Sequence, residues 1–207
     1  IGSGSMGCGD LDCFLLNPGV ECVVVCDVDD AHLKDALAVC QKRERKQPDT
    51  VKDFRRVLDR QDVDAVIIAT PDHWHALPTV LACQAGKDVY VEKPLATTID
   101  EGRAMVTAAQ KHNRIVQMGS QWKSCQHIID AAAFVKSGKL GPVSMVRAWA
   151  WLDWQPEMAA LPDEAPPPGL DYDLWLGPAP KRPYNKNRCH YNFRWFWDYA
   201  GGLMTDW

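Results

Sequence analysis

The chain opens with Ile1-Gly2-Ser3-Gly4-Ser5-Met6-Gly7, a Gly-x-Gly-x-x-Gly loop, and this stretch decides the fold. In a dinucleotide-binding fold the first glycine permits a tight turn, the second lets the backbone approach a pyrophosphate, and the third lets a helix pack close to a strand. The helix that follows would bind phosphate through its N-terminal N–H groups. The candidate phosphate-binding residues are therefore Gly2, Gly4, Ser5, Met6 and Gly7.

An acidic residue at a fixed distance strengthens this interpretation. Asp27 follows the apolar run Val20–Cys26, twenty positions after Gly7. A carboxylate there can accept hydrogen bonds from both hydroxyls of an adenosine ribose. It would repel a 2′-phosphate, and residues 28–30 offer no cation, so the sequence predicts NAD rather than NADP. The alternative is a glycine turn with an unrelated surface aspartate.

Apolar strands alternate with helices over the first 120 residues, which indicates a parallel sheet covered on both faces. We expect strands at residues 20–26, 65–69, 88–91 and 114–118, and helices at 30–41, 53–58, 75–85 and 99–112. Thr98 and Glu101 have the spacing of a capping box. Only Ile1 precedes the glycine loop, so we expect most of the first, central strand to be missing.

The pattern changes after residue 120. We expect a helix at 124–136, then a long strand at 142–154 with alternating aromatics at Trp149 and Trp151. Residues 162–183 contain seven of the fourteen prolines and are expected to form loop. Seven of the nine tryptophans lie at or after Trp149, which suits either a sugar pocket or a sheet core with an interface.

Composition excludes several classes of protein. The net charge is −4 and the basic runs are no longer than Lys42-Arg43, so we expect no nucleic-acid partner. The apolar runs are too short for a membrane span. The eight cysteines include no Cys-x-x-Cys pair and are typical of a reducing compartment. We therefore expect a cytoplasmic protein, with periplasmic export as the alternative if a signal precedes Ile1.

Two polar stretches come directly after predicted strands, where ligands bind in open α/β sheets. The first is Thr70-Pro71-Asp72-His73-Trp74-His75 and the second is Glu92-Lys93-Pro94. The histidines have no cysteine or acidic partner at zinc spacing, so we expect no metal. Lys93 suits a proton-transfer role, because Pro94 ends the strand and turns the chain. The alternative is a solvated charge at a strand end.

The order and spacing of three motifs, namely the glycine loop, Thr70–His75 and Glu92–Pro94, resemble those of the glucose–fructose oxidoreductase, inositol dehydrogenase and MocA (Gfo/Idh/MocA) family. Residues 173–180 and 193–206 also resemble bacterial members of this family. The resemblance implies an α/β protein with an NAD-binding Rossmann domain at 1–120. A truncated α/β domain with a mostly antiparallel sheet would follow at 121–207, and the complete protein would be a homo-oligomer. It implies catalysis by Lys93. It also implies cofactor contacts from Thr70, Pro71, His73, His75, Glu92, Lys93 and Pro94.

The resemblance also points to residues near the end of the chain. Residues 201–206 match the start of a family motif in which an aspartate, here Asp206, precedes a histidine that would lie just past Trp207. We therefore expect a fragment truncated at both ends and inactive by itself, with Asp206 as a second catalytic residue. Many members carry an arginine near residues 119–122, and this chain does not. Candidate substrate contacts are Gln121, Trp122, Tyr191 and Arg194.

The predicted function is hydride transfer between NAD and a secondary alcohol of a sugar, cyclitol or derivative, with a carbohydrate-like small molecule as the substrate. One alternative is an NAD-dependent glycoside hydrolase that oxidises a sugar transiently, eliminates the substituent and reduces the sugar again. Another is a non-enzymatic NAD-binding regulator. An intact Glu92-Lys93-Pro94 argues against the regulator, since a binding module does not need a proton-transfer lysine.

Overall fold

The computed structural model describes residues 1–149 and 157–206. The chain forms two compact units, one made of residues 1–119 together with 161–207 and the other of residues 120–160. The predicted domain division, 1–120 and 121–207, stays a prediction. In the structure the polypeptide from residue 161 onward joins the first unit.

The first unit is built on five parallel strands in two sheets. Strand β1 (Val24–Cys26) pairs with β2 (Asp49–Val51), and the second sheet has the order β3 (Ala65–Ile68), β4 (Asp88–Glu92), β5 (Val116–Gly119). In register, Val24 lies opposite Asp49, Ala65 opposite Asp88, and Val89 opposite Val116. The Rossmann-like parallel arrangement expected from the alternating pattern is confirmed.

Ile1 and Gly2 join the two sheets. The N-terminal ammonium of Ile1 donates to the carbonyl of Ile67 at 2.8 Å, and the N–H of Ala69 donates to the carbonyl of Ile1 at 2.9 Å. On the other side the N–H of Gly2 donates to the carbonyl of Cys26 at 2.8 Å. These residues therefore lie between β1 and β3, in the place of the central strand of a doubly wound sheet.

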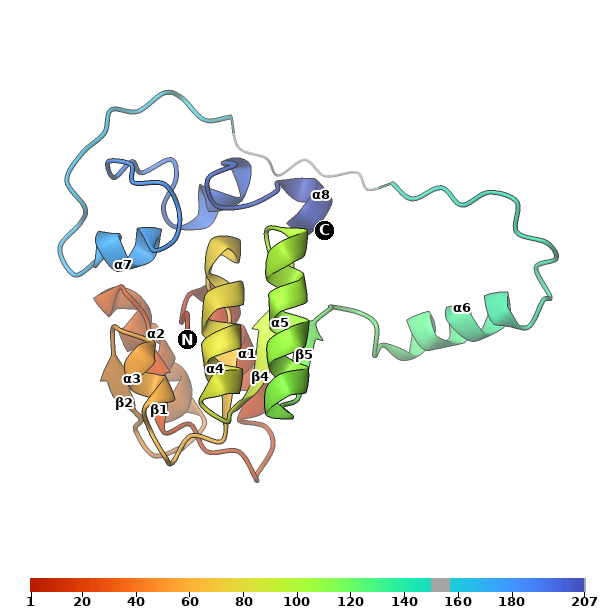
Figure 1. Cartoon of the computed structure of the whole chain (residues 1–207), viewed down its shortest axis with the longest axis horizontal. Coiled ribbons are helices and arrows are strands. Elements are labelled where there is room, and N and C mark those ends of the chain that lie inside the picture. The colour runs from red at the N-terminus through yellow and green to blue at the C-terminus, as the bar shows by residue number, and fades with distance from the viewer. Residues whose placement is uncertain (150–156, 207) are drawn as a thin grey trace. The chain divides into compact units, whose positions relative to one another are not determined.

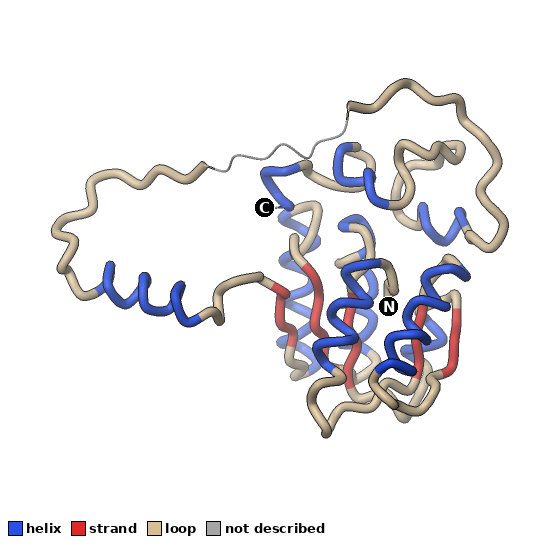
Figure 2. The backbone as a smooth tube through the Cα atoms, turned by 180° about the vertical axis from the view of Figure 1, so that it is seen from behind, coloured by secondary structure: helices blue, strands red, loops and turns tan. Residues whose placement is uncertain are grey.

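Helices cover both faces of the strands (Figures 1 and 2). Helices α1 (Ser5–Phe14) and α2 (Asp30–Lys42) pack together on one face. On the other face α3 (Arg55–Leu58), α4 (Ala76–Gln84) and α5 (Ile99–His112) pack in sequence. The predicted capping box at the start of α5 is confirmed, with Thr98 and Glu101 exchanging backbone-to-side-chain hydrogen bonds.

The core follows from the apolar strands. Ile68 and Val91 are fully buried, and Met105 of α5 is 1% exposed against them. On the other face Val25 of β1 packs against Leu33 and Ala36 of α2. Side chains of these sizes each contribute roughly 1.5–3 kcal/mol when fully buried. The apolar runs of β1, β3 and β4 are thus explained by burial beneath helices, whereas Met118 of β5 is 40% exposed.

Residues 161–206 cross the carboxyl ends of the strands. They contain α7 (Tyr172–Leu176), the 3₁₀ helix η2 (Tyr191–Trp195) and α8 (Leu203–Asp206). Their core is aromatic and consists of Tyr172, Trp175, Tyr184 and Tyr199, packed with Leu176 and Cys189. Trp175 is 3% exposed and Tyr199 is fully buried, so part of the tryptophan and tyrosine enrichment serves packing.

The second unit, residues 120–160, contains α6 (Gln126–Lys136). The long strand predicted at 142–154 is not seen in residues 142–149, which pair with no other described backbone, and Trp151 lies outside the described residues. The mostly antiparallel sheet predicted for 121–207 is likewise corrected. Every described strand pair is parallel, and antiparallel pairing is limited to one isolated bridge, Asp29 with Leu170. A strand needs a second backbone to pair with, and residues 142–149 have no such partner among the described residues.

Two smaller differences concern the first sheet. Strand β1 begins at Val24 rather than Val20, because its partner β2 is only three residues long. Strand β2 itself, Asp49–Val51, was not predicted, because its exposed polar sequence lacks an apolar run.

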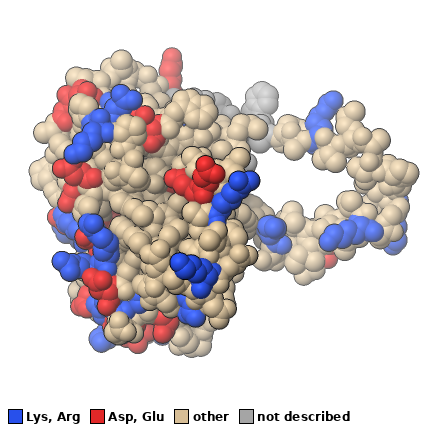
Figure 3. Space-filling model, in the orientation of Figure 1, with Lys and Arg blue, Asp and Glu red and all other residues tan. Residues whose placement is uncertain are grey.

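Over the described residues, no helix combines the length and apolar character that a membrane span requires. Figure 3 shows basic and acidic side chains interspersed over one face of the protein.

The structure predicts different outcomes for two glycines of the same helix. A Cβ on Gly7 would collide with the carbonyl oxygen of Gly2, whereas one on Gly9 meets nothing within 4 Å. Gly7→Ala should lower the free energy of unfolding by about 1–3 kcal/mol, the usual cost of overpacking. Gly9→Ala should raise it by up to about 1 kcal/mol, because alanine is the better helix former. Urea unfolding of both variants in the full-length protein measures this, and equal stabilities would contradict the packing role of Gly7.

Candidate cofactor and active site

A cavity of about 610 Å³ lies at the carboxyl ends of the strands, within the unit formed by residues 1–119 and 161–207. This is the edge at which ligands bind in open α/β sheets. The glycine loop, Asp27 and the ends of β3 and β4 line one side, and residues 174–206 line the other. The lining residues used below are Gly2, Gly4, Ser5, Met6, Asp27, His32, Lys52, Thr70, Pro71, Asp72, Glu92, Lys93, His190, Tyr191, Arg194 and Asp206.

The glycine loop is shaped to receive a diphosphate. Gly2 has φ of +79°, and a Cβ there would come within 2.7 Å of the backbone of Ala69. A Cβ on Gly4 would meet only the ring of His32, at 3.7 Å. Gly4 also precedes α1 without any side-chain capping hydrogen bond, so the first turn of α1 presents uncapped N–H groups to the cavity. These features fit the pyrophosphate of a dinucleotide.

Asp27 is held as a carboxylate. Its Oδ2 accepts the N–H of Ser3 at 2.6 Å, and its Oδ1 accepts the N–H of Asp29 at 2.9 Å and faces Nδ1 of His32 at 3.3 Å. Burial opposes the charge, but the hydrogen bonds from His32, Ser3 and Asp29 outweigh it and hold the pKa of Asp27 below its usual value. The ionised side chain can therefore accept ribose hydroxyls at neutral pH.

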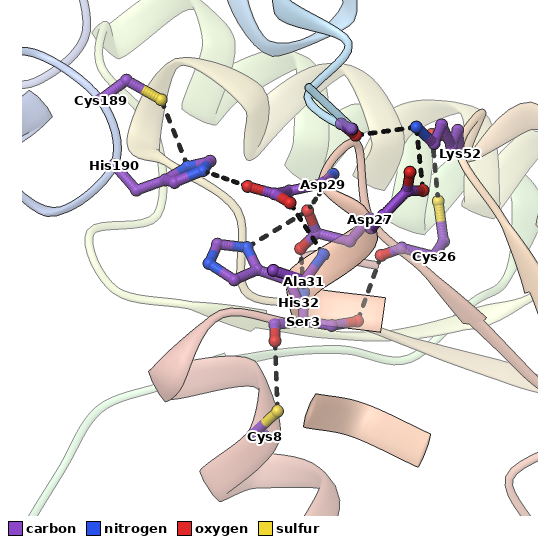
Figure 4. A network of polar contacts seen from close by, with 12 residues as sticks. Ser3, Cys8, Cys26, Asp27, Asp29, Ala31, His32, Lys52, Cys189 and His190 are labelled. Carbon is purple, nitrogen blue, oxygen red and sulfur yellow. Dashed lines mark hydrogen bonds and ion pairs between the residues drawn. The ribbon is translucent and has the colours of Figure 1, made fainter. Parts of the chain in front are cut away.

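Three basic side chains near Asp27 were not predicted from the sequence (Figure 4). Besides His32, His190 places Nε2 at 2.9 Å from Oδ2 of Asp29, and Lys52 places Nζ at 2.9 Å from Asp30. Residues 28–30 carry no cation, as the sequence shows, but these three basic side chains come from outside that stretch. His32 was detectable one turn into α2, whereas no signal in the sequence links residue 190 to this site.

The loop after β3 contributes buried polar atoms. Thr70 Oγ1 and Asp72 Oδ2 are buried in the cavity wall without a hydrogen-bond partner among the described residues. Burial and the nearby Asp206 raise the pKa of Asp72 to about 7. Unpartnered polar atoms of this kind suit a polar ligand. Asp72 was named within its motif but not as a site residue.

The two histidines of this loop lie behind the cavity wall. His75 places Nδ1 at 2.6 Å from the carbonyl of Pro94 and Nε2 at 2.9 Å from that of Thr70. His73 Nε2 lies 3.0 Å from the carbonyl of Trp175, and burial lowers its pKa to about 4. Neither they nor Pro94 are among the lining residues of the cavity, and their contact with the cofactor stays a prediction. The cis peptide Lys93–Pro94 follows β4.

Lys93 and Asp206, the two predicted catalytic residues, lie in contact. Lys93 Nζ donates to Oδ1 of Asp206 at 2.9 Å and to its main-chain carbonyl at 3.1 Å. Arg194 Nε donates to the other carboxylate oxygen at 3.2 Å, so one buried carboxylate holds two cations. Glu92 is 4% exposed beside them, and burial raises its pKa. A lysine so positioned at a strand end is suited to proton transfer.

The four candidate substrate residues fall into two groups. Tyr191 and Arg194 line the cavity, with the Arg194 guanidinium 4.2 Å from the centre of the Tyr191 ring. Gln121 and Trp122 belong to the second compact unit, residues 120–160, and are both exposed. Their contact with substrate stays a prediction.

Comparison with known families covers the whole chain. Residues 1–120 match the Gfo/Idh/MocA model described as an oxidoreductase family with an NAD-binding Rossmann fold. Residues 118–207 match the model of the C-terminal α/β domain of the same oxidoreductase family.

Individual relatives are longer proteins. A glycosyl hydrolase family 109 protein of Shewanella sp. is 34% identical over 122 residues, which are 57% of this chain and 27% of the relative. Levoglucosan dehydrogenase of Pseudarthrobacter phenanthrenivorans is 31% identical over 105 residues, 51% of this chain and 27% of the relative. The WlbA dehydrogenase of Chromobacterium violaceum, solved with NADH and UDP-GlcNAcA, superimposes with a TM-score of 0.60 at 25% identity, covering 68% of this chain and 39% of that one. The chain thus spans about 27% of the length of the two curated relatives.

Replacing Asp27 tests the cofactor end of the cavity. Asp27→Asn should weaken NAD binding to the full-length protein by about 10- to 100-fold, because hydrogen bonds to a charged acceptor are lost. NADP binding should weaken less or improve, since the repulsion of a 2′-phosphate is removed. Calorimetric titration with both cofactors measures this, with Asp59→Asn as the exposed control. NADP binding to the unaltered protein as tightly as NAD would contradict the assignment.

The pH dependence of protein stability in an Asp72 variant tests the protonation state of Asp72 in the cavity wall. The pKa of Asp72 is higher in the folded state than its unfolded value of about 4. The contribution of Asp72 to the free energy of unfolding is therefore fully present below about pH 4 and is lost as the pH rises toward about 7. Asp72→Asn should therefore gain stability over the unaltered protein between about pH 4 and about pH 8. Denaturant unfolding across this range measures the difference. A difference that does not change with pH would show that Asp72 is ionised throughout.

Proposed function

The chain belongs to the Gfo/Idh/MocA oxidoreductase family, and we propose on that basis that the full-length protein transfers a hydride between NAD and a secondary alcohol carbon of a sugar, cyclitol or derivative. The observation that carries the proposal is the pairing of Lys93 with Asp206 in the wall of the same cavity that Asp27 and the glycine loop line. The levoglucosan dehydrogenase and the WlbA complex with NADH support it.

The residues that hold the cofactor follow from their positions around the cavity. The glycine loop and the first turn of α1 would hold the pyrophosphate and Asp27 would accept the adenosine ribose hydroxyls, while Thr70, Pro71 and Glu92 line the remainder of the cavity. NAD, when bound, accepts or returns the hydride. The protein must supply orientation and a path for the hydroxyl proton.

Lys93 is the group proposed to handle that proton. Oxidation of an alcohol requires a base within hydrogen-bond reach of the hydroxyl. Lys93 Nζ is held by two oxygens of Asp206, and Arg194 holds the same carboxylate in place from its other oxygen. Asp206 thereby positions the lysine. Asp72, whose pKa is about 7, lines the same cavity and can take or give a proton at neutral pH.

Hydrolysis by transient oxidation is the second candidate, and the relatives named glycosyl hydrolase family 109 favour it. Both reactions begin with removal of a hydroxyl proton and a hydride, so Lys93 and Asp206 serve either one. A screen of the full-length protein against sugars and glycosides with NAD distinguishes them. Net NADH formation indicates the dehydrogenase, whereas release of the aglycone without net NADH indicates the hydrolase.

Two further parts of the proposal concern the protein as a whole. Helix α6 exposes Ile128, Ile129, Phe134 and Val135, which supports self-association of the full-length protein. All eight cysteines are free thiols, which supports a reducing, cytoplasmic location.

Replacing Lys93 tests the catalytic assignment. Lys93→Met keeps the length of the side chain and removes its proton-transfer group. We expect kcat of the full-length protein to fall by about 10²–10⁴, the usual contribution of general acid–base catalysis, with little change in NAD affinity. Lys111→Met, at an exposed position of α5, should leave kcat unchanged. Turnover of Lys93→Met near the normal rate would make Lys93 a structural charge.

A further inference from the structure

A second cluster of side chains lies beside Asp27 and has no part in the proposed proton transfer. One ligand atom each from Asp29, His32 and His190 lies within 4.8 Å of the others. Asp29 is the residue before α2, His32 lies in its first turn, and His190 comes from the C-terminal segment (Figure 4). The His32 and His190 ring centres are 4.5 Å apart. All three residues belong to the same compact unit.

In each histidine of the cluster, the Nδ1 atom of the ring has a polar partner. Asp27 Oδ1 lies 3.3 Å from Nδ1 of His32, and Cys189 Sγ lies 3.3 Å from Nδ1 of His190. Metal-bound histidines in proteins typically have their second ring nitrogen held by a carboxylate or another polar group, which fixes the tautomer and the ring orientation. The cluster therefore has the supporting contacts of a metal site as well as the ligands.

The charges around the cluster favour a cation. Asp27 and Asp29 are 7% and 15% exposed in their side chains, and hydrogen bonds hold the pKa of each carboxylate below its usual value. The nearby ammonium of Lys52 pairs with Asp30, at 2.9 Å, rather than with either of them. These two negative charges, one buried and one partly buried, lie beside two imidazole ligands, and the hydrogen bond to Asp27 raises the pKa of His32. Bound divalent metal would neutralise them.

We propose that Asp29, His32 and His190 form a binding site for a divalent transition-metal ion of the zinc class. Two imidazoles and one carboxylate are ligands that zinc prefers, and they leave a fourth position for water. The ion fastens residue 190 of the C-terminal segment to the start of α2, at the rim of the cofactor cavity. The site is separate from His73 and His75, and it does not depend on the proposed dehydrogenase activity.

Zinc binding to the full-length protein, freed of metal by a chelator, tests the proposal. Calorimetric titration with zinc chloride should give one ion per chain, with affinity falling as the pH is lowered, because protons compete with the ion for its ligands. Zinc should also raise the thermal unfolding temperature, since it binds only the folded arrangement. Removing one ligand should weaken binding at least about tenfold.

The variants are chosen to keep the fold. Asp29→Asn removes the charge while asparagine retains the capping hydrogen bond that Asp29 accepts from the N–H of Ala31. His190→Ala removes a ligand, and His190→Cys replaces it with another zinc ligand and should restore binding. His127→Ala, at an exposed histidine of α6, is the control and should bind zinc normally. Absence of zinc binding, or equal binding by the Asp29→Asn, His190→Ala and unaltered proteins, would overturn the proposal.

Discussion

The close approach of α1 to the backbone of Gly2 is the constraint on which the rest of the structure depends. Gly7 has no room for a Cβ because the carbonyl oxygen of Gly2 lies against it, and Gly2 in turn packs on the backbone of Ala69. Ile1 and Gly2 can then pair with β3 on one side and with Cys26 on the other. The junction brings the ends of β1, β3 and β4 to one edge, and this edge carries the cavity.

The two ends of that cavity differ in their electrostatics. At the end near α2, ionised Asp27 and Asp29 face His32 and His190. At the other end Lys93 and Arg194 share Asp206, while the buried Asp72 has a pKa of about 7. The first end is suited to recognition of hydroxyl groups. The second is suited to movement of protons, because Asp72 can exchange a proton near neutral pH in the same cavity as Lys93.

The C-terminal segment is held to the strand ends largely by polar contacts. The carbonyl of Trp175 accepts the indole N–H of Trp74 at 2.9 Å and lies 3.0 Å from Nε2 of His73. Lys52 donates to the carbonyl of Gly169 at 2.8 Å. Aromatic packing around Tyr199 then makes the segment rigid enough to present His190, Arg194 and Asp206 to the cavity. The motif Thr70–His75 thus acts partly as a docking surface for the segment.

The sequence by itself determined the Rossmann half, the position of Asp27 and the placing of Lys93 at a strand end. These follow from local rules: glycines that permit close approach, apolar runs that require burial on both faces, and a capping box that starts α5 at Ile99. It could not place His32 and His190 beside Asp27, or show that His73 and His75 face carbonyl oxygens behind the cavity wall. Nor did it exclude a strand at 142–149, because a strand exists only where another backbone pairs with it. Contacts between residues more than a hundred positions apart, such as Lys93 with Asp206 and Asp29 with His190, were decided only by tertiary structure. Their geometry depends on how the C-terminal segment packs across the strand ends, and local sequence preferences carry no record of that packing.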